Sequence, residues 1–552
     1  METRTWIFVA LLAAACVSLI QAEDEELPPN NIAETDTGSN DNAEETNPNA
    51  EETNPNAEGT NPNAEETNPN AEETNLAGPA DNNTGVQDDN QEGDQGSSSG
   101  PSITTSASSS ETTTEEVETV TKKEFDIIGV RMKSYLGRNF NAFCGIPYAE
   151  PPINKRRFKN PVPMTYDGTI DATNCEETPV CMQMRWHLDE TEVIGVEDCL
   201  FLNVYEPEVT SSNLPVIVYI HGGGFFSGSG TFNDVGPHYF MDQDIVLVTI
   251  NYRLGPLGFW GTNTHNAPNN LGLRDQVLAL EWVRHYIGHF RGDKYRVTLM
   301  GEGAGGASVQ LHLYSSMSRH LFHRAISQSG VAFNSWALMK DMVTPSYTHA
   351  SIIGCFETTE ARLLRCMQTV DAAIIVNTTA GLRSWLSEPL VIYRPAVQSR
   401  FGHDEIFLKK EIMHYLMTNN FHNVPWLVGT VNTPSFFHLQ RYLKDEKLRS
   451  SLLGKFQQFG AKMLDLDASI ADPMKLETAF KIISAAYSDS TGKLDKDGIV
   501  QIFNDREGNL GLMLTVAYHA LLGHKNLYLY RFEYRAQHSM AENITGVKKM
   551  TW

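Results

Sequence analysis

The stretch that most constrains the fold spans residues 297–310, where an apolar segment ending at Met300 meets a glycine-rich turn and then small residues suited to begin a helix. This order is typical of a nucleophile elbow, in which a Gly-x-Ser-x-Gly turn lifts a serine hydroxyl above a parallel sheet. The middle residue is Gly303, which has no side chain to attack a carbonyl carbon. Glycine adopts the strained backbone of an elbow without a Cβ penalty. The segment predicts an elbow without its hydroxyl, and a plain glycine-rich turn is the alternative.

The N-terminal part of the chain has a different composition from the rest. An apolar run over residues 6–20, followed by Gln21 and Ala22 and then acidic residues, predicts a secretory signal peptide over residues 1–22. Residues 23–121 contain 25 acidic residues and no Lys or Arg, which accounts for the whole net charge of −25. The remaining chain is neutral, so its charge gives no reason to expect nucleic-acid binding.

The acidic segment also has a simple repeat. A seven-residue unit, NAEETNP, starts at Asn42 and recurs with small changes, and residues 98–110 are rich in Ser and Thr. Each unit lacks an apolar seam, and its proline would break a helix, so a coiled coil is not expected. Residues 23–121 are therefore predicted to be a disordered acidic tail.

Strands and helices are expected to alternate over residues 122–552. An apolar strand over residues 216–220 runs into a glycine loop, a second follows at 245–250, and a helix-periodic segment at 270–283 leads to the elbow. This alternation predicts an α/β fold with a mostly parallel central sheet and helices on both faces. No later run is long and apolar enough to span a bilayer.

Four motifs carry a family resemblance: FCGIPYAEPP from Phe143, EDCLFLNVY from Glu197, HGGGF from His221 and NYRLGPLGF from Asn251. In this order and spacing they resemble the cholinesterase and type-B carboxylesterase family of α/β-hydrolases. The resemblance extends from about Phe125 to the C-terminus. It implies an α/β-hydrolase fold over the whole domain.

The resemblance also implies an oxyanion hole. Its donors would be the backbone N–H groups of Gly223, Gly224 and Ala304. A plain tight turn is the alternative interpretation of the glycine run. Such donors would remain in place without a serine at position 303.

Two further triad positions follow from the family pattern. The acid position falls on Pro434 and the histidine position on Lys549, so Gly303, Pro434 and Lys549 replace all three triad members. A lysine is charged at neutral pH and is a poor proton acceptor unless it is strongly desolvated. Because the triad acts as a unit, the sequence predicts that the chain is not an enzyme.

Six cysteines follow the signal segment, an even number that suits an oxidising compartment. The resemblance implies the disulfides Cys181–Cys199 and Cys355–Cys366, which leaves Cys144 and Cys175 as a pair by elimination. A metal site is the rival, but no CxxC or clustered histidine spacing favours it, and no cofactor is expected. Glycosylation sequons lie at Asn82, Asn377 and Asn543.

Three functions are compatible with these features. The first is a secreted, non-catalytic protein that binds an extracellular protein or matrix component, like the cholinesterase-like adhesion molecules. The second is a carrier of a small apolar ligand in the pocket. The third is a carboxylic ester hydrolase with a relocated nucleophile. Ser308 would lie on a different face of the predicted helix from the elbow, and Ser327 and Ser329 follow a strand but have no identified base. The first is the expected function.

Overall fold

The structure, a computed structural model, describes residues 118–534 except 124, 186–191, 385–387, 399–405 and 468–469. The predicted signal segment, most of the acidic tail and Lys549 lie outside the described residues, as do the sequons at Asn82 and Asn543. Within the part described, no helix combines the length and apolar character needed to cross a membrane.

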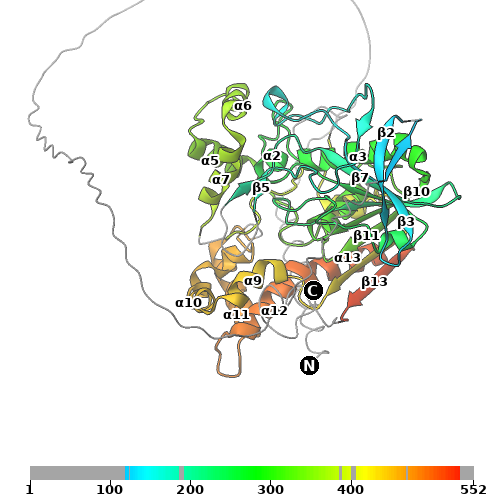
Figure 1. The fold of residues 1–552 in the computed structure, drawn as a ribbon. Coiled ribbons are helices and arrows are strands. Elements are labelled where there is room, and N and C mark those ends of the chain that lie inside the picture. Colours follow the sequence, from blue (N-terminus) through cyan, green and yellow to red (C-terminus); the bar gives the residue numbers. More distant parts are fainter. Residues whose placement is uncertain are drawn as a thin grey trace, which may run out of the picture. The chain divides into compact units, whose positions relative to one another are not determined.

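A large sheet runs through the domain, to the right in Figure 1, and six adjacent described strands of it are parallel. In spatial order these are β9 (Val246–Ile250), β8 (Leu214–Ile220), β10 (Gly292–Glu302), β11 (Arg324–Gln328), β12 (Trp426–Val431) and β13 (Leu527–Phe532). The strands predicted at 216–220 and 245–250 are therefore β8 and β9. The predicted mostly parallel α/β sheet is confirmed.

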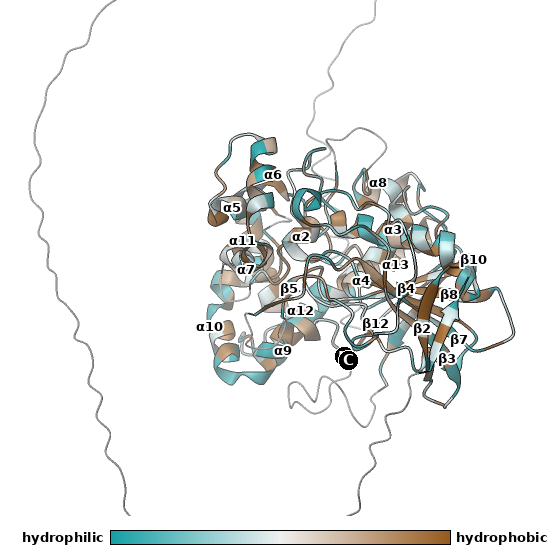
Figure 2. Ribbon diagram, turned by 45° about the horizontal axis from the view of Figure 1, so that its top comes forward, coloured by the Kyte–Doolittle hydropathy of each residue, from teal (hydrophilic) through white to brown (hydrophobic). Residues whose placement is uncertain are grey.

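Antiparallel strands extend the sheet beyond β9. They are β7 (Phe201–Pro207), β3 (Asn139–Pro147), β2 (Ile127–Lys133) and β1 (Thr119–Lys122), with the short β4 (Ile170–Asp171) beside β2. A separate small ribbon pairs β5 (Gln183–Met184) with β6 (Val193–Ile194). Figure 2 shows the strands of the large sheet mainly in brown, as expected for strands buried in a core.

Among the described helices, the main contacts with the parallel strands come from α3 (Leu271–Tyr286), α4 (Ala304–Tyr314) and α13 (Leu510–Leu521). The helix predicted at 270–283 is α3. Every residue of α4 is buried, including the polar Ser308, Gln310 and His312, so the helix lies wholly inside the core. The first turn of α4 is therefore held firmly against the sheet.

The remaining helices lie in the connections between strands. They are α2 (Gly255–Phe259), α5 (Val343–Ile353), α6 (Glu360–Thr369), α7 (Ala372–Thr378), α8 (Ile412–Met417), α9 (Phe436–Lys444), α10 (Glu446–Met463), α11 (Pro473–Ala486) and α12 (Lys496–Asn504). Helices α9 to α12 share a hydrophobic cluster that is distinct from the core under the sheet. The pocket described below has residues of both regions in its walls.

Three disulfides connect the described cysteines. Cys181–Cys199 and Cys355–Cys366 are the pairs that the resemblance implies, and Cys144 pairs with Cys175. Asn377 is exposed on α7. An oligosaccharide at Asn377 would therefore extend into solvent.

Candidate functional site

The turn between β10 and α4 has the backbone shape of an elbow. Gly303 has φ of 54° and ψ of −116°, in a region that residues with a Cβ rarely adopt. Among the described residues, a Cβ at this position would come near only one neighbour, the Cα of Gly222 at 4.0 Å. The side-chain direction at position 303 is therefore open, but the glycine places no hydroxyl there.

Hydrogen bonds fix three peptide groups beside this turn, those that carry the N–H groups of Gly223, Gly224 and Ala304. In each peptide the carbonyl oxygen accepts the bond. The Nδ1 of His221 donates to the Gly222 carbonyl at 2.8 Å, and the N–H groups of Phe226 and Ser227 donate to the Gly223 carbonyl. The Ala307 N–H donates to the Gly303 carbonyl at 2.9 Å. In a trans peptide the N–H points opposite to the C=O.

It follows that the N–H groups of Gly223, Gly224 and Ala304 point away from these bonded carbonyls. Within the described part of the chain, none of the three donates a hydrogen bond to a protein acceptor. All three residues line the same pocket. We call these three N–H groups the cradle. The N-terminus of α4 adds a partial positive charge beside it, so the cradle suits a carbonyl oxygen or a small anion.

The pocket has a volume of about 640 Å³, within the range of small-molecule sites. Gly303 and Pro434, two of the three residues that replace the triad, both line it. Its apolar walls include Trp336, Leu390 and Val391. A ligand with one polar carbonyl and an apolar chain matches this lining.

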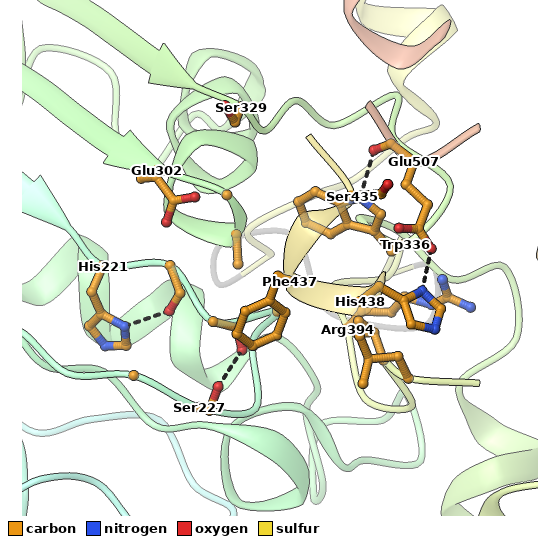
Figure 3. Close-up of a pocket in the computed structure, with 18 of the residues that line it drawn as sticks. His221, Ser227, Glu302, Ser329, Trp336, Arg394, Ser435, Phe437, His438 and Glu507 are labelled. Atoms are coloured by element: carbon orange, nitrogen blue, oxygen red, sulfur yellow. Dashed lines mark hydrogen bonds and ion pairs between the residues drawn. The ribbon is translucent and has the colours of Figure 1, made fainter. Parts of the chain in front are cut away.

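Glu302, the last residue of β10, brings a carboxylate into the pocket next to the cradle (Figure 3). A Cβ on Gly222 would collide with this carboxylate, so the glycine loop and Glu302 lie in direct contact. Burial raises the pKa of Glu302 to about 7. The sequence interpretation overlooked Glu302, although its position directly before Gly303 could have indicated it.

A cluster of paired charges lines another part of the pocket, to the right in Figure 3. His438 on α9 contacts Glu507 through Nδ1 at 2.6 Å and Glu388 through Nε2 at 2.7 Å. Burial alone would lower the pKa of His438, but the two carboxylates together raise it well above its usual value. The nearby Arg394 forms an ion pair with Asp465. Sequence reasoning missed this cluster because its members are far apart in the chain.

The alternative nucleophiles named above lie in different surroundings. Ser308 is buried in α4, where its hydroxyl donates to the Ala304 carbonyl, and Ser327 is buried with its hydroxyl on the Gly306 carbonyl. Neither lines the pocket. Ser329 does line it, with a positive φ of 49°. Of the three serines, only Ser329 is therefore part of the pocket wall.

An elbow and a glycine-loop cradle on a mostly parallel sheet define an α/β-hydrolase. Residues 115–551 match the Carboxylesterase family, and the chain belongs to that family. It is 34% identical over 444 residues to juvenile hormone esterase of Tribolium castaneum, covering 77% of this chain and 74% of that protein.

Two further comparisons agree with this assignment. Venom carboxylesterase-6 of Apis mellifera is 33% identical over 426 residues, which is 76% of each chain. The crystal structure of juvenile hormone esterase from Manduca sexta has a TM-score of 0.69 at 24% identity, covering 78% of this chain and 81% of that one. This last likeness is one of fold.

The relatives contradict the prediction that the chain is not an enzyme. They carry the names of esterases at 33% and 34% identity over most of this chain, and so point to an enzyme. The prediction equated the replacement of all three triad members with the loss of all ester chemistry, although water is also a nucleophile for esters. The relatives also give no support to the predicted non-catalytic, adhesion-like role.

Proposed function

We propose that this chain is a carboxylic ester hydrolase that binds the acyl carbonyl oxygen of its substrate at the cradle. The observation that carries the proposal is the set of three N–H groups, of Gly223, Gly224 and Ala304, that have no acceptor in the described protein and face one pocket. Such donors stabilise the negative charge that develops on the carbonyl oxygen during ester cleavage. Membership of the carboxylesterase family supports the same reaction class.

The walls of the pocket suggest the kind of ester. Leu390, Val391 and Phe437 offer apolar contacts, and the volume of about 640 Å³ has room for a medium-length acyl or alkyl chain. We therefore propose an apolar ester as substrate. Because Gly303 has no side chain, attack on this ester requires a nucleophile from elsewhere.

A pair of variants at one residue tests the cradle. Ala304→Pro removes one cradle N–H at the first position of α4, where proline is well tolerated and where no hydrogen bond to a described residue is lost. Ala304→Gly keeps the N–H and is the matched control. We expect Ala304→Pro to lower kcat for p-nitrophenyl butyrate by about 100-fold or more, with little change in the control.

Binding is measured separately with the ketone that replaces the ester oxygen of the substrate by CH2. A rise in melting temperature with this ketone, together with release of p-nitrophenol above a boiled control, supports the hydrolase. Saturable ketone binding without turnover would instead favour a carrier. Absence of both would contradict the proposal.

We also propose that the protein is secreted. The apolar run over residues 6–20 and the three disulfides support an oxidising, extracellular environment. We expect the full-length protein in the medium of expressing cells, and we expect it to stay inside the cells when residues 1–22 are deleted. Binding to an extracellular protein or matrix component stays a prediction, testable by pull-down with and without residues 23–121.

A further inference from the structure

Glu302 differs from the other carboxylates that line the pocket. Asp234 accepts a hydrogen bond from Ser229, Asp465 pairs with Arg394, and Glu507 pairs with His438. Among the residues that the structure describes, none donates a hydrogen bond to the Glu302 carboxylate or forms an ion pair with it. Its oxygens are therefore available to a ligand or to water in the pocket.

Among the described residues, the groups that face Glu302 leave its charge uncompensated. Tyr219 of β8, Tyr252 after β9 and Tyr530 of β13 interact with it electrostatically, and burial raises the pKa of each tyrosine. They stay neutral. His221 on the neighbouring loop is also neutral at pH 7, because burial lowers its pKa to about 4. A carboxylate without a cation beside it is basic enough to accept a proton near neutral pH.

The carboxylate is also in the right place relative to the cradle. It lies against Gly222, directly before the two cradle glycines of the loop, and one residue before Gly303. The side-chain direction at Gly303 is open, so water can approach a carbonyl carbon at the site that a serine hydroxyl would occupy. Figure 3 shows the Glu302 carboxylate beside the loop that follows His221.

We propose that Glu302 is a catalytic residue, the general base that activates water for direct attack on the bound ester. The water oxygen forms a bond to the carbonyl carbon while Glu302 takes the proton, and the cradle holds the resulting oxyanion. The C–O bond to the alcohol then breaks as Glu302 returns the proton to the leaving oxygen. The products are the acid and the alcohol, with Glu302 ionised again, and no acyl-enzyme forms.

This inference rests on the proposed ester-hydrolase function, and the experiment separates the two. Glu302→Gln is compared with wild type and with Glu281→Gln, a control in which a half-buried carboxylate with a raised pKa is removed from α3 outside the pocket. Each protein is assayed for turnover of p-nitrophenyl butyrate, binding of the matching ketone and labelling by a fluorophosphonate probe. Ketone binding reports whether the pocket is folded.

We expect Glu302→Gln to lose at least about 100-fold in kcat while it keeps ketone affinity, and Glu281→Gln to behave as wild type. Glu302→Asp should retain part of the activity. Wild-type kcat should rise with pH through a midpoint near the Glu302 pKa of about 7, and the fluorophosphonate should label none of the proteins.

Two results would overturn the role of Glu302 alone: turnover within about threefold of wild type in Glu302→Gln, or stoichiometric fluorophosphonate labelling that reveals a nucleophilic side chain. Absence of both turnover and ketone binding in the wild type would overturn the proposed function, and the role of Glu302 with it. Ketone binding without turnover in the wild type would reject both the hydrolase function and the role of Glu302, and would indicate that the pocket only binds its ligand.

Discussion

The pocket is lined by two regions that differ in whether their charged and polar groups are paired with other described residues. Beside the sheet, the cradle and Glu302 present polar groups that no described residue satisfies. Toward helices α9 to α12, His438 is held between Glu388 and Glu507, and Arg394 is paired with Asp465. Paired charges fix a structure, whereas unsatisfied ones are available for binding and chemistry. The difference locates the reactive part of the pocket beside the sheet.

The largest expected effect comes from breaking the paired region. His438→Leu leaves Glu388 and Glu507 buried without their shared cation, and should lower the free energy of unfolding by about 3–5 kcal/mol in urea titrations at pH 6. Because the folded-state pKa of His438 is raised, its stabilisation is complete below the unfolded pKa of about 6.5 and is lost as pH rises through the raised value. The loss caused by His438→Leu should therefore shrink in alkaline solution.

A second buried histidine provides the control for this variant. His349 bonds to the hydroxyls of Tyr393 and Thr378, which are neutral partners. His349→Leu should cost only about 1–3 kcal/mol, since it leaves no buried charge behind. An equal loss in the two variants would show that the charges around His438 contribute nothing specific.

Removing the Glu302 charge, which no described residue pairs with, should raise the free energy of unfolding. The pKa of Glu302 is raised from 4.5 to about 7 by burial, so the folded state loses stability as pH rises through this interval. Glu302→Gln removes that loss and should stabilise the protein at pH 8 by up to about 3 kcal/mol, less where water in the pocket screens the charge. Near pH 4 the side chain at position 302 is neutral in both folded proteins, so wild type and Glu302→Gln should have similar free energies of unfolding. Destabilisation of Glu302→Gln at pH 8 would contradict the absence of a partner.

A smaller effect concerns the backbone of the elbow. Among the described residues, the Cβ that Gly303→Ala adds meets only the Gly222 Cα at 4.0 Å, so its cost is backbone strain at a φ of 54°. We expect a loss of about 1–3 kcal/mol in the free energy of unfolding. Gly454→Ala, at an exposed site in α10 with no neighbour near the added Cβ, should instead stabilise by about 0.5–1 kcal/mol. Equal stabilisation by both would show that the elbow is unstrained.

The cradle could be predicted from sequence because each part of it is local. The glycine loop directly follows β8 and Ala304 directly follows the elbow, so the order of strands is enough to bring Gly223, Gly224 and Ala304 together. The paired region has no such signal: Glu388 and Glu507 lie 50 and 69 residues from His438, and only packing joins them.

The inference about activity failed for a related reason. It considered only positions 303, 434 and 549, where the family pattern places reactive side chains. The fold keeps the cradle, and Glu302 supplies a half-buried carboxylate beside it. The sequence contains Glu302 next to Gly303, but whether a described residue pairs with its carboxylate depends on the three-dimensional surroundings. Motif matching does not reveal that property.

The smallest expected effect tests how firmly the cradle is held. The Gly223 carbonyl accepts the Ser227 hydroxyl at 3.1 Å as well as the N–H groups of Phe226 and Ser227. Ser227→Ala removes only the hydroxyl, so two backbone donors still fix the direction of the Gly224 N–H. Ketone affinity should change by less than about threefold and stability by about 1 kcal/mol or less. A loss of kcat comparable to that of Ala304→Pro would mean that the hydroxyl itself contacts the substrate, and the set of groups available for chemistry would then extend beyond the cradle and Glu302.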